Sequence, residues 1–203
     1  MADMITREIA QRVRDLVDAG LVNGVGVAEP GKMCVEATMC FALGLPHGDD
    51  PGCVAQPLRW LKIRLNDAAW SSNEARAAGL RRLAVAQLGS ASVLDEAEFV
   101  TRVVDMTIRK AVPIGLRAAA RLNPKFAGQL KAAAVRCKQE GTREACEEAQ
   151  AIARAAATAA TAATAARMRD RVLADYAEWV VEILIDMHAP GCQFLDLVPQ
   201  VAA

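Results

Sequence analysis

The sequence predicts an all-α protein, and three observations point to that class. About one residue in five is alanine, the best helix former, whereas only 4% are aromatic. No segment alternates apolar and polar residues with the period of two that is typical of a half-buried strand. The 203 residues are 53% hydrophobic and 24% charged, so they can bury a core. We therefore expect a multi-helix orthogonal or bundle domain that ends in one very long, alanine-rich helix.

Turn and capping residues set the order of the predicted helices. Gly20 and Gly44 end the first two, and Ser71 with Glu74 has the spacing of a capping box at the start of the fourth. Pro113 requires a kink or a new helix start. The expected helices cover residues 5–17, 31–43, 58–67, 71–88, 96–111, 124–140 and 143–187.

The last of these helices is too long for a compact domain. No Gly or Pro interrupts residues 143–187, so a straight helix there would be roughly 65–70 Å long. A compact chain of this size is only about 40–45 Å across. We expect a compact helical domain over residues 1–141, and over residues 142–203 a long helix whose C-terminal half packs on that domain, followed by a short tail. The overhang favours a homo-oligomer in which this helix pairs with another chain.

The same patterns predict which side chains form the core. Apolar residues recur three and four apart on the expected helices, and the C-terminal half of the long helix carries such a stripe. The predicted core residues are Trp60, Leu61, Leu65, Leu80, Leu83, Val103, Ile108, Leu116, Val172, Tyr176, Val180 and Ile183.

One segment, residues 29–53, holds three of the six cysteines and one of the two histidines. Cys34 is expected in the first turn of a helix, where unpaired N–H groups and a nearby lysine stabilise a thiolate. With His47 or His188 as base, Cys34 would be the nucleophile of a small hydrolase or thiol enzyme. A cysteine at the head of a helix resembles papain-like enzymes, although those enzymes place the histidine on a sheet. The alternative interpretation is a small thiol packed in the core.

The same segment also carries ligand types that zinc prefers. Cys34 and Cys40 are six residues apart on a helix and point about 120° away from each other, so they do not chelate together. Glu36 and Cys40 share a face and could join His47 and Cys53 in a metal site. The spacing matches no tight zinc pattern, so we expect no cofactor unless zinc binds here.

Charge is unevenly distributed along a chain whose net charge is zero. Residues 59–138 contain 15 basic and 6 acidic side chains, and no acid lies between Met106 and Gln139. Such a region would bind an acidic protein partner or the phosphates of a nucleic acid. The alternative is that acidic flanking helices neutralise it. The predicted partner-binding residues are Arg109, Lys110, Arg117, Arg121, Lys125, Lys131 and Arg136.

These patterns favour a non-enzymatic binding or assembly protein, which acts through the basic region and the long helix. The thiol enzyme and a nucleic-acid-binding protein are the alternatives. No apolar run approaches the length of about 18 residues that spans a bilayer, and the N-terminus lacks the apolar core of a signal peptide. We therefore expect a cytoplasmic protein that does not enter a membrane.

Overall fold

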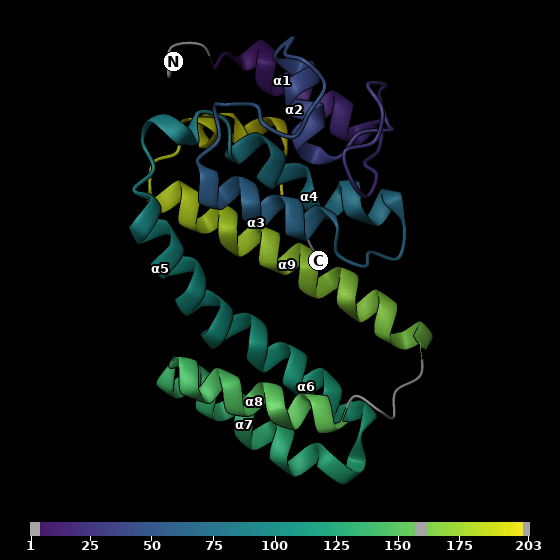
Figure 1. Cartoon of the computed structure of the whole chain (residues 1–203), viewed down its shortest axis with the longest axis vertical. Coiled ribbons are helices and arrows are strands. Elements are labelled where there is room, and N and C mark those ends of the chain that lie inside the picture. Colours follow the sequence, from purple (N-terminus) through teal and green to yellow (C-terminus); the bar gives the residue numbers. More distant parts are fainter. Residues whose placement is uncertain (1–4, 157–161, 201–203) are drawn as a thin grey trace. The chain divides into compact units, whose positions relative to one another are not determined.

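The computed structural model describes residues 5–156 and 162–200, and within them the chain is helical (Figure 1). The β pairing in this part of the chain is a single bridge between Gly26 and Met33. None of the described helices is both long and apolar enough to cross a bilayer. The elements are α1 (Arg7–Asp18), α2 (Val35–Ala42), α3 (Gln56–Asn66), α4 (Asn73–Ala86), η2 (Ser90–Ser92), α5 (Glu96–Met106), η3 (Thr107–Ala111), α6 (Val112–Leu122), η4 (Pro124–Phe126), α7 (Ala127–Glu140), α8 (Arg143–Ala156), α9 (Ala162–Asp186) and η6 (Pro190–Leu197).

The chain divides into two compact units. Unit 1 combines residues 1–99 with residues 173–203, and unit 2 is the continuous segment 100–172. These boundaries differ from the expected division at residue 141, because residues 100–141 belong to the same unit as residues 142–172. The C-terminal half of α9 packs with the N-terminal helices. Ala177, Val180, Val181 and Leu184 on that half are buried.

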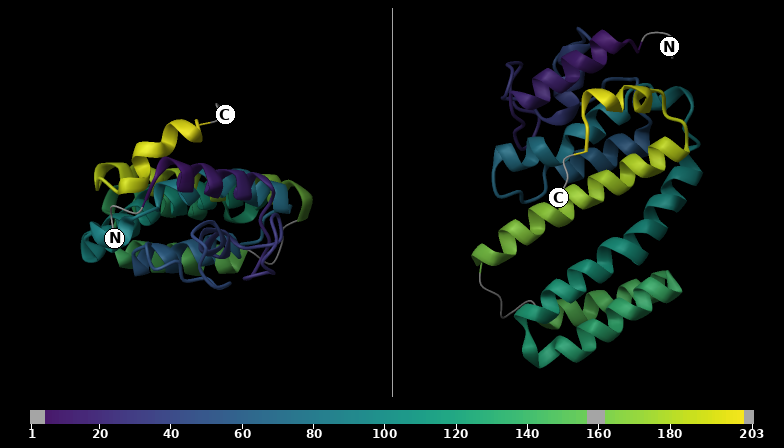
Figure 2. Two further views of the ribbon diagram at one scale, coloured as in Figure 1. Left: turned by 90° about the horizontal axis from the view of Figure 1, so that it is seen from above. Right: turned by 180° about the vertical axis from the view of Figure 1, so that it is seen from behind.

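Helix α4 lies at the centre of unit 1. It contacts α1 on one side and η6 on another, and Figure 2 shows η6 lying against both helices. Leu80 and Leu83 are fully buried on its inner face. Gly191 at the start of η6 sits so close to α4 that a Cβ there would be 2.3 Å from the carbonyl oxygen of Val85. The absent side chain therefore lets the C-terminal segment pack directly on the backbone of α4.

The helix starts in unit 1 have the expected capping side chains, although the cap of α4 lies one residue later than predicted. The Oγ1 of Thr6 accepts a hydrogen bond from the Ile9 amide at the start of α1. At α4 the cap is Ser72, whose Oγ accepts from the Ala75 amide at 3.1 Å. The prediction of Ser71 as the cap was therefore wrong by one residue, since two adjacent serines offer the same side-chain oxygen.

Helices α6, α7 and α8 of unit 2 pack together through small side chains. Their buried cluster includes Leu116, Leu130 and several alanines, which allow the helix axes to approach closely. Pro113 breaks no helix here. It occupies the first turn of α6, where its missing N–H is tolerated, and the five-residue π-helix η3 immediately precedes α6.

The C-terminus of α7 is closed by two residues. Gly141 adopts the left-handed conformation with a φ of 66° and its amide donates to the carbonyl oxygen of Cys137 at 3.0 Å. The guanidinium of Arg109 donates to the carbonyl oxygens of Lys138, Gln139 and Glu140 at 2.9–3.0 Å. These bonds satisfy carbonyls that have no partner inside the helix.

The single long helix predicted over 143–187 was wrong. The structure has α8, which ends at Ala156, and a separate 25-residue α9, while residues 157–161 lie outside the described part of the chain. Because α8 buries Ala145 and Ala149 against the other helices of unit 2, it is a packed element and not an arm. The self-association expected from that arm stays a prediction.

Most predicted core residues are buried or half-buried, but Trp60 is not. Leu65, Leu80, Leu83, Ile108, Leu116, Val180 and Ile183 are buried, whereas Leu61, Val103, Val172 and Tyr176 are half-buried. Trp60 is 55% exposed on α3. The inner face of that helix is made by Leu58, Lys62 and Leu65, which are four and three residues apart.

Candidate functional site

Cys34 is the N-cap of α2, and its sulfur serves as the capping acceptor. The Sγ accepts a hydrogen bond from the Ala37 amide at 3.3 Å, in the place where serine or threonine usually provides an oxygen. The side chain is buried, and burial raises the pKa of the Cys34 thiol, although hydrogen bonds from backbone amides oppose that shift. A buried thiol of this kind is a poor nucleophile at neutral pH.

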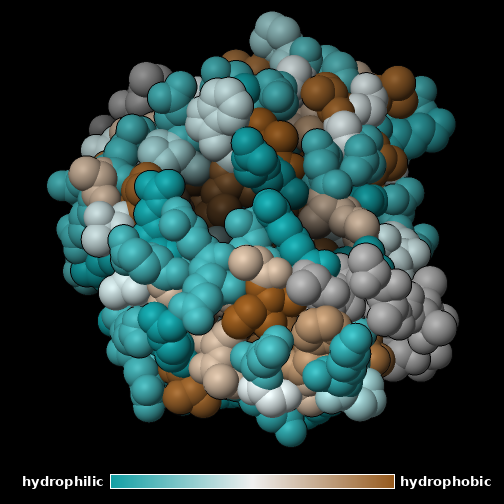
Figure 3. All heavy atoms as spheres, turned by 60° about the horizontal axis from the view of Figure 1, so that its bottom comes forward, coloured by the Kyte–Doolittle hydropathy of each residue, from teal (hydrophilic) through white to brown (hydrophobic). Residues whose placement is uncertain are grey.

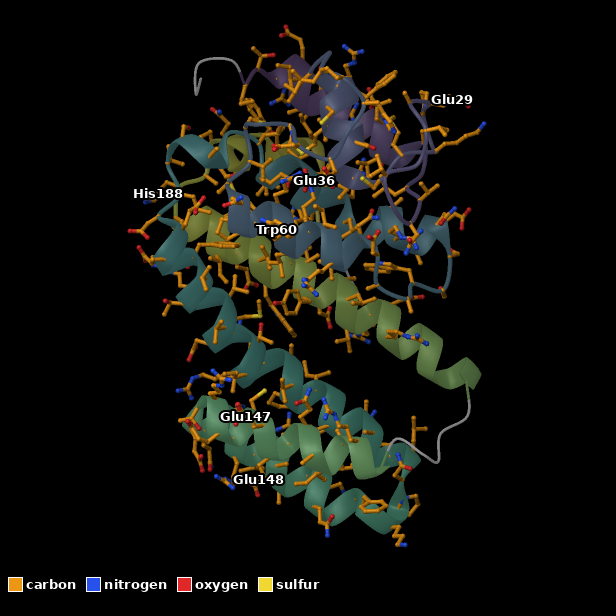
Figure 4. The ribbon with its side chains drawn as sticks, in the orientation of Figure 1. Glu29, Glu36, Trp60, Glu147, Glu148 and His188 are labelled. Carbon is orange, nitrogen blue, oxygen red and sulfur yellow. The ribbon has the colours of Figure 1, made fainter. Side chains whose placement is uncertain are left out.

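The two histidines proposed as its base have other surroundings. The Nε2 of His47 lies 3.1 Å from the carbonyl oxygen of Gly26, so His47 holds the loop before α2. His188 follows the end of α9 with a φ of 57° and lies away from Glu36 in Figure 4. Among the hydrogen bonds of the described residues, none joins Cys34 to either histidine. The structure therefore does not bring the proposed Cys–His pair together.

The residues of the proposed metal site do not converge either. Glu36 and Cys40 are both buried on α2, and burial raises the pKa of Cys40 to about 11. Cys53 lies instead beside Gly89, where it lines a separate cavity of about 70 Å³. Within the described ranges, no three His, Cys, Asp or Glu side chains are grouped so that they could hold a metal ion.

The structure reveals a buried ion pair that the sequence analysis did not predict. Glu36 on α2 and Lys62 on α3 are both 0% exposed, and the Nζ of Lys62 lies 3.5 Å from Oε1 of Glu36. The signal was present in the sequence, because Lys62 falls on the apolar stripe between Leu58 and Leu65. A lysine on such a stripe is buried only when it has a partner.

Burial acts in opposite directions on the two members of this pair. It raises the pKa of the Glu36 carboxyl and lowers the pKa of the Lys62 ammonium, because the charged form of each is poorly solvated. In both cases the charge of the other member opposes the shift. The pair therefore places two ionisable groups inside an apolar unit, where the charged form of each carries a substantial desolvation cost.

The polar groups around this pair are incompletely hydrogen-bonded. Apart from the Lys62 ammonium, no donor among the described residues reaches the carboxylate oxygens of Glu36, and the hydroxyl of Thr38 and the side-chain oxygen of Gln87 are buried without a hydrogen-bond partner. The Nζ of Lys62 approaches the sulfur of Met39 at 3.9 Å, and the amide nitrogen of Gln87 contacts the same sulfur. Buried polar atoms without partners are rare in folded proteins and point to a bound water, ion or functional role.

A neighbouring polar network is, by contrast, well satisfied. The side chain of Asn66 accepts from the Val35 amide at 3.3 Å and donates to the carbonyl oxygen of Val22 at 2.9 Å. The guanidinium of Arg76 donates to the backbone oxygens of Asn66 and Leu21. This network attaches the loop before α2 to the C-terminal end of α3 and is structural.

The basic region of unit 2 separates into two groups. Arg109 caps α7 and pairs with Asp105, and Arg136 pairs with Glu140 and Glu148, so these two of the predicted binding residues serve the unit itself. The other five are exposed, and hydrophilic side chains dominate the face drawn in Figure 3. The exposed group is Lys110, Arg117, Arg121, Lys125 and Lys131, and Lys138 is exposed as well.

Helix geometry places most of these exposed cations on one face. Arg117 and Arg121 lie one turn apart on α6, and Lys131 and Lys138 lie two turns apart on α7. Gly115 and Ala119 of α6 line a cavity together with residues of α8, and Arg136 of α7 pairs with Glu148 of α8. At 100° per residue, the four cations therefore point away from α8. We call Arg117, Arg121, Lys131 and Lys138 the α6–α7 basic face. None of these four cations is paired with an acid among the described residues.

Comparisons with known proteins give no further guide to the site: no protein-family model, no curated protein and no solved structure matches this chain.

Proposed function

We propose that unit 2 is a non-enzymatic binding module, which attaches to an acidic surface of a partner protein through the α6–α7 basic face. The observation that carries this proposal is the four exposed cations on one side of two packed helices. No acidic residue lies between Met106 and Gln139 to neutralise them. A cationic face of this kind attracts an acidic partner and accelerates their association.

The spacing of the cations favours a helical partner. Arg117 and Arg121 are about 6 Å apart along the axis of α6, which is the spacing of two acids four residues apart on another helix. Arginine also binds carboxylates in a planar, bidentate geometry that lysine does not offer. A partner helix with acids at that interval would lie along the seam between α6 and α7.

The aromatic residues of unit 2 argue against a nucleic-acid strand as the partner. Proteins that bind single strands stack the bases on exposed aromatic rings. Within residues 100–154 the one aromatic residue is Phe126, which is half-buried against the core. The Nζ of Lys125 lies 5.7 Å from the centre of its ring. With its ring half-buried and a lysine beside it, Phe126 is a poor surface for stacking bases.

Fluorescence anisotropy with two labelled probes tests the proposal. The probes are a helical peptide with glutamates at every fourth position and a DNA duplex of equal net charge, each titrated at 50 and 200 mM salt. We expect Arg117→Glu together with Lys131→Glu to weaken peptide binding at least tenfold. The control is Arg154→Glu, which reverses an exposed cation on α8 and should change affinity less than twofold.

Three results would contradict the proposal. The first is absence of peptide binding at 50 mM salt, because electrostatic attraction is strongest there. The second is an equal loss of affinity in the double variant and in Arg154→Glu, which would mean that total charge matters and the face does not. Tighter binding of the duplex than of the peptide would favour a nucleic-acid partner instead.

A further inference from the structure

An exposed apolar side chain lies within the α6–α7 basic face. Val135 on α7 is 45% exposed, whereas Ala133, Ala134 and Cys137 of the same helix belong to the buried cluster of unit 2. Val135 follows Lys131 by four residues and precedes Lys138 by three. At 100° per residue it is therefore only about 40° and 60° from the two lysines around the helix. The three side chains form one stripe with an apolar centre and a cation at each end.

Helix α6 adds its two arginines to the same surface. Helices α6 and α7 pack against each other and are joined by residues 123–126 alone, so they run antiparallel (Figure 1). Arg117 and Arg121 point away from α8, as the lysines of α7 do. Val135 is therefore surrounded by cations from both helices.

This arrangement matches the anatomy of a protein interface, in which an apolar centre is enclosed by a polar rim. A single exposed valine is ordinary on a protein surface. The cations around Val135 distinguish it, because a partner whose acids pair with them brings one of its own side chains over the valine. Lys131 and Lys138 are about 10.5 Å apart along the axis of α7, so two acids seven residues apart on a partner helix match them.

We propose that the partner helix carries an apolar residue between two acids that are seven residues apart, and that this residue packs on Val135. The inference rests on the proposed function, because it names the chemistry of the same helical partner. The acids attract the helix and orient it, whereas the apolar contact selects among acidic helices. A helix that is acidic or polar at the central position leaves Val135 uncovered.

Two labelled helical peptides test this selection by fluorescence anisotropy with the full chain. Both contain two glutamates seven residues apart, and the residue four positions after the first glutamate is leucine in one peptide and glutamine in the other. Glutamine keeps the net charge and has nearly the same helix propensity as leucine. We expect the leucine peptide to bind about three- to tenfold more tightly, because it buries apolar surface on Val135. The ratio should be the same at 50 and 200 mM salt, since salt screens charges but not apolar burial.

Two matched variants locate the contact. Val135→Ser should remove the preference for leucine and leave binding of the glutamine peptide within about twofold of wild type, because the cations are unchanged. Val104→Ser makes the same change on α5 of the same unit, at a residue that is 50% exposed and outside the α6–α7 basic face. This control should keep the full preference.

The outcomes separate this inference from the proposed function. Equal affinity of the wild-type protein for the two peptides, both weakened by Arg117→Glu with Lys131→Glu, would overturn the inference and leave the proposed function standing. Absence of binding by both peptides at 50 mM salt would reject the proposed function and the inference together. A loss of preference that is equal in Val135→Ser and Val104→Ser would also overturn the inference, because the leucine would then not bind at Val135.

Discussion

Removing one member of the Glu36–Lys62 pair should destabilise unit 1 far more than removing both. Glu36→Met leaves the ammonium of Lys62 buried without a counter-charge, and Lys62→Met does the same to the carboxylate of Glu36. The double substitution leaves two apolar side chains of similar volume in contact. Methionine suits both positions because it is unbranched and fills irregular space.

The expected sizes follow from the distance and burial of the pair. At 3.5 Å and an effective dielectric constant of about 20, two unit charges attract by about 5 kcal/mol. Because both side chains are 0% exposed, desolvation costs several kcal/mol for each ion and offsets most of that attraction. Each single variant should therefore lose about 3–5 kcal/mol of unfolding free energy. The double variant should lie within about 1 kcal/mol of the wild type or above it.

Urea unfolding followed by tryptophan fluorescence measures these changes. Trp60, Trp70 and Trp179 all belong to unit 1, so the signal reports on the unit that contains the pair. The reasoning would be refuted if the double variant lost as much unfolding free energy as the two single variants together. Such additivity would show that the two side chains stabilise the unit independently. Single-variant losses below about 1 kcal/mol would also refute it, since they would mean that water reaches the charges.

The same variants give a pH dependence with a definite sign. The folded pKa of Glu36 lies above its ordinary value of 4.5, so its contribution to stability is present below pH 4.5 and is lost as the pH rises through the folded pKa. The folded pKa of Lys62 lies below its ordinary 10.5, so its contribution is present above pH 10.5 and is lost as the pH falls through the folded pKa. The stability of the double variant relative to wild type should therefore be greatest near neutral pH. If the stability of the double variant relative to wild type instead grew toward low or high pH, the pKa directions given for Glu36 and Lys62 would be wrong.

Three further substitutions or reactions test the fold and the thiol. Gly191→Ala should lower the unfolding free energy measured in urea by about 1–3 kcal/mol, because its Cβ would lie 2.3 Å from a backbone oxygen of α4. Gly115→Ala is the control: its Cβ would have no atom within 4 Å, so it should be neutral or slightly stabilising. Ser72→Ala should cost about 1 kcal/mol, and an unchanged midpoint would mean that its hydroxyl does not cap α4. Native Cys34 should react with a disulfide reagent at neutral pH far more slowly than in urea, because burial raises its pKa, and equal rates would contradict its burial.

Local patterns in the sequence predicted most helices but not how the C-terminal half is arranged. Glycine, proline and capping residues act within a few positions, so the ends at Gly20, Gly44 and Gly141 followed from them. Whether α8 continues into α9 depends on what each helix packs against. Alanine favours a helix in both segments and carries little information about its partner, because every alanine face looks alike. The sequence pattern therefore could not distinguish two packed helices from one long arm.

The candidate sites also differ in how far the sequence could predict them. The exposure of most cations in the basic region could be predicted, because a run of cations without acids stays exposed wherever the helix lies, whereas their binding of a partner stays a prediction. The histidine partners of Cys34 and the proposed metal ligands required knowledge of which loops meet, and that depends on tertiary packing. The sequence did contain a signal for the Glu36–Lys62 pair. Lys62 has apolar neighbours four residues before it and three residues after it, and a charged side chain at such a position conflicts with the amphipathic pattern of the helix.

The conflict between the charge of Lys62 and the apolar face of α3 is informative, because an apolar residue at position 62 would not destabilise the helix. Leu58 and Leu65 are buried on either side of Lys62, and α3 would pack through them without a charge between them. Replacing a buried ion pair with apolar side chains is often neutral or stabilising, so stability alone does not account for its presence. The double substitution measures directly how much the pair contributes to stability. A double variant that is more stable than the wild type would show that the pair lowers the stability of unit 1, so that its presence would need a reason other than folding.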